Sequence, residues 1–362
     1  FGADALRMTL ATFAPSVKRI ALAPKRIEGY RFFANKMWNA TRFSMEHTGN
    51  VDAKALAFGA APKSNAFYNQ WILSRLSRTT DIALNAIDEV RLDEAVLELY
   101  RFFWTDLCDW FLELGKIAFQ TESDWKDLGG ITTKAHVDET RATLVFVLEQ
   151  SFRLIHPFMP YVTEELWQRL VFPNSALGTS GKTIALEKYP SPADFVRNEA
   201  LEQDMDLLQK TITGIRGIRG EYDLKSEQVV VSLRTADPRN LALIESNRAA
   251  IAKLCRADLR FEKPGAERAA GTVSGVVPSD RGPIEIHIHL KGIVTKDKEL
   301  DRIARETKRI EKELATIQKK LNSPGFVDRA PPEVVAESKT QELSMVDALS
   351  RLKDAAKLVD EL

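Results

Sequence analysis

Apolar residues recur at helical spacing along the first 190 residues of the chain. The intervals of three and four predict helices over about residues 1–22, 26–47, 67–90, 92–118 and 138–156, with a further helix starting at Pro160. The rings of the aromatic stretch 92–118 fall at the same spacing, which is typical of a buried bundle core. We therefore predict a mainly α fold in which residues 1–190 form a helical bundle.

The predicted helix over residues 26–47 has two different faces. Core side chains are expected on one arc, which holds Phe33, Ala34, Met37, Trp38, Thr41 and Met45. The opposite arc holds Phe32, Asn35, Lys36, Asn39, Arg42 and Phe43. This second arc combines amide, cationic and aromatic groups, which are the groups that stack on unpaired RNA bases and hydrogen-bond to them. On this helix alone, an ordinary solvated face is the commoner explanation.

Residues 191–294 change character and indicate a small α/β module. A connecting helix over 196–223 precedes a strand at 229–233 and a helix over 238–255. Strands follow near 258–262, 271–277 and 284–290. In the connecting helix, Gly214, Gly217 and Gly220 recur every third residue and predict close packing along one side. His287 and His289 alternate onto one face of the last strand, but a metal site needs further ligands, so we predict an ordinary strand face and no metal.

Residues 295–362 have the heptad pattern of a coiled coil. The a and d positions of its first half are Leu300, Ile303, Thr307, Ile310, Leu314, Ile317 and Leu321. A break at 322–325 precedes a second apolar seam that runs from Val335 to Val359. Two such helices joined by a short break predict an antiparallel coiled-coil hairpin. Ser338 and Glu342 interrupt the second seam, so the tip of the hairpin should be its less stable part.

Charge on the first hairpin helix is sorted by face. Acidic residues flank the seam, and the cations predicted to point outward include Lys298, Arg302, Arg305 and Arg309. Simple solvation of an exposed helix explains the acids well. A row of outward cations fits a phosphate backbone better.

The overall charge and composition narrow the classes of protein that fit. The 362 residues carry 51 Lys and Arg against 51 Asp and Glu, so an RNA-binding role requires segregated charge. The segment from Ser16 to Arg42 contains seven basic residues and a single acidic one, Glu28. Two cysteines, Cys108 and Cys255, suit a reducing cytoplasm and cannot form a cysteine-based zinc site. With no signal-like N-terminus and no apolar run that would span a bilayer, we expect a cytoplasmic protein without a membrane partner.

One stretch resembles a phosphate-binding loop. Residues 176–183 end in Gly181-Lys182-Thr183, but Ala176 replaces the first required glycine. A phosphate-binding loop also lies between a strand and a helix, and the segments on either side of this stretch have neither pattern. We therefore interpret this stretch as a surface loop and predict no catalytic residue in the chain.

Several long stretches, in order along the chain, resemble the class I aminoacyl-tRNA synthetases and most closely the valyl-tRNA synthetases. They are FGADALR at 1–7, GYRFFANKMWNATRF at 29–43, FYNQWILSRL at 67–76, LYRFFWTDLCDWFLELGK at 99–116, LIHPFMPYVTEELWQRL at 154–170 and SPGFVDRAPPEVV at 323–335. Because these stretches are long and span nearly the whole sequence, the resemblance is far more specific than a short motif.

The resemblance implies three tRNA-binding parts. Residues 1–190 correspond to the anticodon-binding domain, 191–294 to a linker module and 295–362 to an arm that packs on the outer corner of tRNA. Residues matching Lys36, Asn39 and Phe43 meet anticodon bases in this family, with Asn35 and Arg42 close by. For the arm the resemblance implies only the region, so the four arm cations are inferred from heptad position.

The resemblance also implies a larger enzyme. The full enzyme joins valine to its tRNA with ATP and magnesium. The sequence has no initiator Met, and FGADALR follows the catalytic signature loop in the family, so we expect a fragment that needs no cofactor and is inactive alone. We expect a valine-specific tRNA as partner, no DNA, and a monomer.

Three alternatives remain open at this point. The first alternative is the equivalent region of an isoleucyl enzyme, although those enzymes often end in a cysteine-rich zinc module. The second is a non-enzymatic protein whose hairpin binds another protein. The third is a free-standing RNA-binding module.

Overall fold

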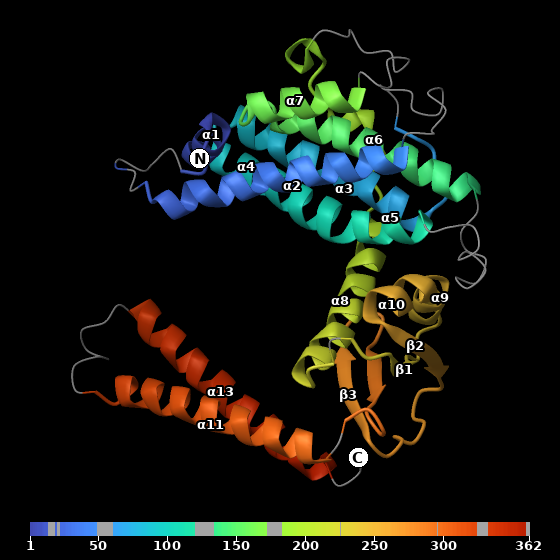
Figure 1. Cartoon of the computed structure of the whole chain (residues 1–362), viewed down its shortest axis with the longest axis vertical. Helices are drawn as coiled ribbons and strands as arrows, with labels where there is room; N and C mark the ends of the chain where they lie inside the picture. The colour runs from blue at the N-terminus through green and yellow to red at the C-terminus, as the bar shows by residue number, and fades with distance from the viewer. Residues whose placement is uncertain are drawn as a thin grey trace. The chain divides into compact units, whose positions relative to one another are not determined.

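The structure, a computed structural model, describes most of the chain. The described residues are 1–13, 19, 22–48, 61–119, 134–171, 183–224, 226–294, 296–323 and 332–359. They divide into two compact units, Phe1–Leu207 and Leu208–Leu362 (Figure 1). Helices dominate, with one small mixed sheet, so the predicted fold class is confirmed. The three-part division at residues 190 and 294 remains a prediction.

The first unit is a bundle of helices around an aromatic and aliphatic core. Its helices are α1 (Ala3–Ala11), α2 (Pro24–Thr48), α3 (Phe67–Asp88), α4 (Leu92–Arg101), α5 (Leu112–Ala118), α6 (Lys134–Ile155) and α7 (Pro160–Val171), with the π-helical segment Phe102–Phe111 joining α4 to α5. Short 3₁₀ turns follow at Ile184–Leu186 and Pro192–Asp194. The largest fully buried side chains include Trp167, Phe102, Phe103 and Phe111, as the aromatic pattern of 92–118 predicted for that segment.

The beginning of α7 shows how local chemistry fixes an element. Pro160 occupies the first turn, where its missing N–H has no intrahelical partner to lose. The Asp4 carboxylate of α1 accepts hydrogen bonds from the backbone N–H groups of Tyr161 and Val162, at 3.2 and 2.7 Å. A carboxylate at a helix N-terminus is also favoured by the helix dipole, so this contact joins α1 to α7.

Two predicted helices of the bundle differ from the observed ones. The helix predicted over 1–22 ends at Ala11, and the Thr12 hydroxyl donates to the Thr9 carbonyl in the final turn. Pro15 follows within four residues of Ala11 and is incompatible with a helix interior. Part of the rest of that prediction, and most of the loop predicted at 176–183, lie outside the described residues. The stretch 92–118 is helical throughout, but its middle is a π-helix, which helical periodicity does not predict.

The second unit contains a four-stranded sheet in the order β2-β1-β4-β3. The strands are β1 (Val229–Arg234), β2 (Ala257–Glu262), β3 (Thr272–Val277) and β4 (Ile284–His289). β1 pairs in parallel with β2 and antiparallel with β4, and β3 pairs antiparallel with β4. The parallel crossover runs through α9 (Pro238–Ser246) and α10 (Arg248–Cys255). One helix was predicted here; it breaks at Asn247, whose side-chain amide donates to the Leu243 carbonyl at 2.9 Å.

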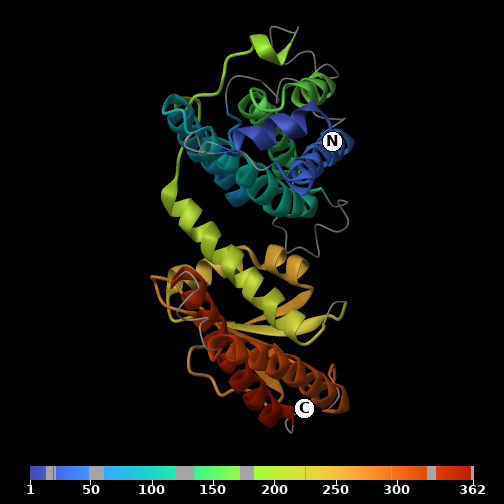
Figure 2. The same cartoon turned by 90° about the vertical axis from the view of Figure 1, so that its left-hand side faces the viewer.

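The connecting helix α8 (Glu199–Glu221) ends against one face of the sheet (Figure 2). A Cβ at Gly214 would lie 2.9 Å from Ile286 Cδ1 of β4, so only glycine fits there without movement. Gly217 and Gly220 have no atom within 4 Å of such a Cβ. Close packing along all three glycines was therefore wrong, and a single glycine makes the contact.

The hairpin consists of α11 (Lys296–Leu321) and α13 (Pro332–Leu358), which lie side by side (Figures 1 and 2). Ile303, Val335 and Val359 are buried in the seam as predicted, but Leu300 is 49% exposed and does not join it. The two interrupting positions have polar partners on α11: Lys320 Nζ lies 3.4 Å from the Ser338 hydroxyl, and Gln318 donates to Glu342 at 3.0 Å. Most of the stretch at 323–335 lies outside the described residues.

Candidate nucleic-acid interface

The buried stripe of α2 differs from the predicted arc. Phe33, Met37 and Thr41 are buried as expected, and Ala40 and Ser44 are buried with them. Trp38 and Met45 are instead 41% and 40% exposed, so their placement in the core was wrong. The small side chains at 40 and 44 let α2 approach the other bundle helices, and the stripe is rotated toward them. The larger apolar residues are left at the surface.

The centre of the exposed face carries three of the predicted site residues. Asn35, Asn39 and Arg42 are all exposed and follow one another at intervals of three and four. Among the described residues, neither asparagine amide makes a side-chain hydrogen bond. Arg42 lies 3.9 Å from Glu46, a loose contact between two well-exposed side chains. The donors and acceptors of this strip are therefore available to a ligand.

The two other predicted residues of α2 lie along one edge of this strip and already have partners in the protein. Lys36 Nζ is 2.9 Å from Asp109 Oδ1 and 4.9 Å from the Trp104 ring centroid, and both partners belong to the π-helical segment. Burial opposes the charged form of Lys36, but the hydrogen bond to Asp109 outweighs it and raises the pKa of the ammonium group. The structure thus places Lys36 beside the strip but ties it to an acid.

Phe43 lies on the same edge as Lys36, about two helical turns farther along. Its ring centroid is 4.2 Å from that of His47 and 6.1 Å from that of Phe119. Lys116 Nζ of α5 lies 5.7 Å from the Phe43 centroid. Phe43 is half-buried by these contacts, so only part of the ring is open to a base.

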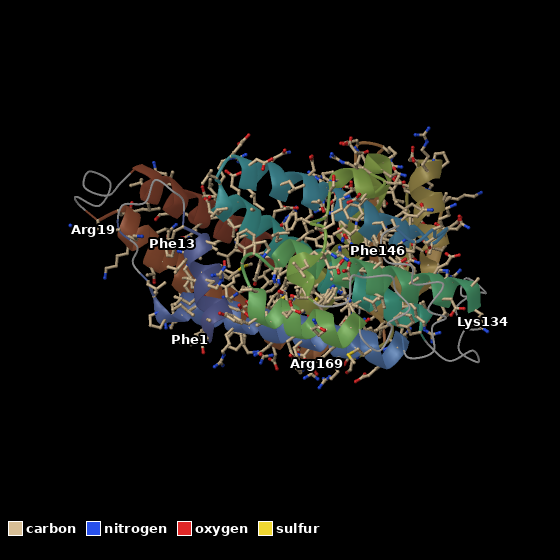
Figure 3. The ribbon with its side chains drawn as sticks, turned by 90° about the horizontal axis from the view of Figure 1, so that it is seen from above. Phe1, Phe13, Arg19, Lys134, Phe146 and Arg169 are labelled. Carbon is tan, nitrogen blue, oxygen red and sulfur yellow. The ribbon has the colours of Figure 1, made fainter. Side chains whose placement is uncertain are left out.

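The opposite edge contains a pair that the sequence analysis missed. The Arg169 guanidinium of α7 lies 5.0 Å from the centroid of the exposed Trp38 ring. Figure 3 labels Arg169 on the side of the bundle where α7 runs beside α2. The sequence held one usable signal, since Trp38 stands between Asn35 and Arg42 at helical intervals of three and four. With the Arg31 guanidinium 5.6 Å from the Phe32 ring centroid at the start of the strip, four cation–aromatic pairs border it.

Within the first unit, a buried ionic cluster ties three helical segments together. Arg75 of α3 is 2.9 Å from Asp106 of the π-helical segment and 3.3 Å from Glu202 of α8. Burial of Glu202 disfavours its charge, but the Ser74 hydroxyl with Arg78 and Arg75 outweighs burial and holds the pKa of that carboxyl below its usual value. For Asp106 burial prevails over Arg75, and its pKa is raised. Removing one partner of such a cluster leaves a buried charge unpaired, so the cluster fixes the helices that position the strip.

The arm cations do not form a free row. Arg302 pairs with Glu299 at 2.5 Å, and its guanidinium lies 4.7 Å from the Tyr222 ring centroid. Arg309 pairs with Glu306 at 2.8 Å and with Glu313 at 3.0 Å. Arg305 is exposed and donates only to a backbone carbonyl within the described arm. The side chain of Lys298 lies outside the described residues.

The strand histidines hydrogen-bond to hydroxyl groups. His287 Nδ1 is 2.7 Å from the Ser274 hydroxyl, and His289 Nε2 is 3.0 Å from the Ser232 hydroxyl. Across the described ranges, no three His, Cys, Asp or Glu side chains gather as metal ligands would. No helix in the described part has the length and apolarity to span a membrane.

Two protein families match successive parts of the chain. The family described as the anticodon-binding domain of tRNA ligase matches residues 69–234, and the valyl tRNA synthetase tRNA binding arm matches residues 297–358. The first match begins after the polar strip on α2. The second coincides with the hairpin.

Curated relatives match over nearly the full chain. Valine–tRNA ligase of Geobacter sulfurreducens is 35% identical over 94% of this chain and 36% of its own length. The Acinetobacter baylyi valine–tRNA ligase is 33% identical over 100% of this chain and 36% of its own length. The Aquifex aeolicus enzyme is 31% identical over 99% of this chain and 30% of its own length. A solved Agrobacterium radiobacter LeuRS–tRNA–LeuAMS complex matches 65% of this chain and 22% of its own at 15% identity, and its TM-score of 0.36 is too low to establish a shared fold.

The chain spans about a third of the length of these curated relatives. Its matches combine an anticodon-binding domain with the arm specific to valyl enzymes. The resemblance found in the sequence is therefore confirmed, and the isoleucyl alternative loses its support. The chain belongs to the valyl-tRNA synthetase family, as the C-terminal part that carries the anticodon-binding domain and the tRNA-binding arm.

Proposed function

We propose that this chain binds valine tRNA and reads its anticodon with the exposed face of α2. The observation that carries the proposal is the strip of Asn35, Asn39 and Arg42, whose polar groups stand at the surface within the stretch that resembles the family's anticodon reader. An asparagine amide both donates and accepts, which matches the edge of an unpaired base. Arg42 supplies a cation for a neighbouring phosphate.

Lys36 and Phe43 complete one edge of the site. Lys36 reaches a base or phosphate when it exchanges Asp109 for the RNA, and Phe43 offers the open part of its ring for stacking. Replacing Phe43 with Ala is expected to cost roughly 1–3 kcal/mol of binding, the scale of a lost base–aromatic contact.

The hairpin arm adds affinity that does not depend on the anticodon. Arg305 is the arm cation best placed for a phosphate, because Arg302 and Arg309 are held by neighbouring acids. Contacts to phosphate fix position and carry no sequence information. The arm is thus proposed to hold the outer corner of the tRNA, and Lys298 remains part of this proposal.

The whole protein is proposed to be a cytoplasmic valine–tRNA ligase that uses ATP with magnesium to attach valine to its tRNA. The matched part carries the tRNA-binding functions, and no catalytic, cofactor or metal role is assigned to its residues. We propose a monomer that binds one tRNA.

The test is equilibrium binding of the 362-residue chain to two transcripts. One is valine tRNA, and the other is the same tRNA with a replaced anticodon. The proposal predicts tighter binding to the first, with both affinities falling as salt rises. Equal affinity for the two transcripts would show that the anticodon is not read, and no binding to either would overturn the proposal as a whole.

A further inference from the structure

Trp38 is a large aromatic residue that lies outside the buried stripe of α2. Its side chain is 41% exposed on a helix whose buried stripe is complete without it. Met45 follows two turns later on the same line of the helix and is 40% exposed. Trp38 and Met45 together give this side of α2 an exposed apolar surface.

The surroundings of the ring are polar and cationic. Asn35 lies one turn before Trp38 and Arg42 one turn after it on the exposed face of α2. Arg31 stands two turns before it and is exposed; it has no ion pair to any described residue, and its guanidinium lies 5.6 Å from the Phe32 ring centroid. Arg169 is 5.0 Å from the ring centroid and is itself paired with Glu165 at 2.5 Å. Cations therefore outnumber acids around the indole.

This combination selects one class of ligand. A flat apolar ring stacks on the face of a planar aromatic group, and amide groups hydrogen-bond to the edge of a base. Guanidinium groups pair with a phosphate. The Trp38 indole N–H donates to no group within the described residues, so it too is free to bind. A nucleotide carries all three features. A protein segment would need an aromatic side chain, a polar edge and acidic groups from several residues to match the same surface.

We propose that Trp38, backed by Arg169, is a stacking site for one unpaired nucleotide at the α7 edge of the anticodon-reading strip. The inference rests on the proposed function and adds a second aromatic contact, on the edge opposite Phe43. Two aromatic rings then hold the RNA from both sides of the strip, while Asn39 between them reads a base edge. The Arg169 guanidinium, 5.0 Å from the indole centroid, supports the ring through a cation–π contact.

The test is a double-mutant cycle between the protein and the RNA. The protein variants are Trp38→Leu, which keeps an apolar side chain without a ring, and Trp38→Phe, which keeps a ring. The RNA variants are valine tRNA transcripts in which each anticodon-loop nucleotide in turn is made abasic. Tyr161→Leu is the matched control, since Tyr161 is a 69% exposed aromatic residue in the first turn of α7, far along that helix from Arg169.

Trp38→Leu is expected to raise the Kd for intact tRNA by roughly 5- to 150-fold, and Trp38→Phe by much less. At one abasic position the loss should disappear, with parent and Trp38→Leu binding within about twofold of each other. Tyr161→Leu should bind like the parent. Thermal melting of each variant reports whether it is folded.

Two results would overturn the inference. One is a folded Trp38→Leu chain that binds intact tRNA like the parent. The other is an additive loss at every abasic position, which would mean that no single base meets this ring. If Trp38→Leu fails to fold, Trp38→Phe serves in its place, because this variant keeps a ring and should lose little affinity. A Trp38→Phe chain that loses as much affinity as an abasic substitution would also overturn the inference. In each case parent binding that still depends on the anticodon leaves the proposed function standing.

Discussion

Lys36 illustrates how a single side chain is shared between the fold and the candidate site. Its ammonium group donates to Asp109 at 2.9 Å, and about a third of the lysine side chain is exposed. To contact RNA, Lys36 must give up this acid, and the carboxylate also repels incoming phosphates. The contact therefore competes with binding.

Replacing Asp109 with Asn should strengthen RNA binding. The change removes a competing acceptor and one negative charge, and exposed ion pairs of this kind contribute about 0.2–1 kcal/mol, so tRNA affinity should rise by roughly 1.5- to 5-fold. The measurement is the Kd for valine tRNA at fixed salt. Glu94→Gln is the matched control, because it neutralises an exposed acid that pairs with Arg91 at the start of α4. Weaker binding by Asp109→Asn would mean that the acid positions Lys36 for RNA.

His136 gives the bundle a pH-dependent stability. Burial lowers the pKa of this imidazole, partly opposed by Glu139, and its Nε2 is hydrogen-bonded to the Tyr68 hydroxyl. The unfolded chain protonates His136 near pH 6.5, and the folded chain does so only at lower pH. Below about pH 6.5 the unfolded state therefore binds more protons, and stability falls as the pH falls.

Thermal unfolding at about pH 7.5 and about pH 5.5 checks this expectation. The melting temperature of the parent should drop on acidification, and His136→Gln should reduce that drop. His156, whose pKa burial also lowers, accounts for part of what remains. An equal drop in parent and variant would show that His136 does not titrate in this window.

Residue identities predicted the site only in part. The resemblance identified Asn35, Asn39 and Arg42, which the structure leaves exposed on one face. It did not reveal that Lys36 is tied to Asp109, since the two residues meet only through the fold. Projection of the helix at 100° per residue put Trp38 on the core arc, whereas the buried stripe includes the small residues Ala40 and Ser44.

At the scale of elements, the base of the arm is held by Arg302. This side chain pairs with Glu299 and lies over the Tyr222 ring at 4.7 Å. Its neighbour Arg305, three residues later, is exposed and has no acidic partner among the described residues. The two arginines therefore have different expected roles, one within the second unit and one toward RNA.

Single substitutions separate these roles. Arg305→Ala should lower the slope of log affinity against log salt by about 1, because one phosphate contact is lost. Arg302→Ala should leave the slope nearly unchanged and instead lower the melting temperature of the second unit, through loss of the Tyr222 contact. A larger slope change for Arg302 than for Arg305 would place the RNA on the other face of α11.

Most elements were predictable because each repeats one simple period. The heptads of α11 and the alternation in β4 need no tertiary information to recognise. The exceptions are set by local polar contacts or by packing. The break at Asn247 comes from a side-chain hydrogen bond, and the π-helical turn between α4 and α5 occurs where the Asp106 carboxylate meets Arg75 of α3.

At the scale of the whole molecule, the chain is expected to bind tRNA without activating valine. Its matched parts are an anticodon-binding domain and a tRNA-binding arm, and it spans about a third of its relatives. ATP–pyrophosphate exchange with valine should stay at background for the 362-residue chain. Clear exchange activity that stays with the purified chain, and does not come from a contaminating enzyme, would contradict this expectation. It would require a nucleotide-binding site in the chain.

Asn39 lies at the centre of the α2 face that we propose reads the anticodon. The most direct measurement is the ratio of the Kd for anticodon-replaced tRNA to the Kd for valine tRNA, compared between the parent chain and Asn39→Ala. We expect a ratio well above one for the parent and a markedly smaller ratio for Asn39→Ala, at an unchanged melting temperature because Asn39 is exposed. A folded Asn39→Ala chain that keeps the parent's ratio would contradict the claim.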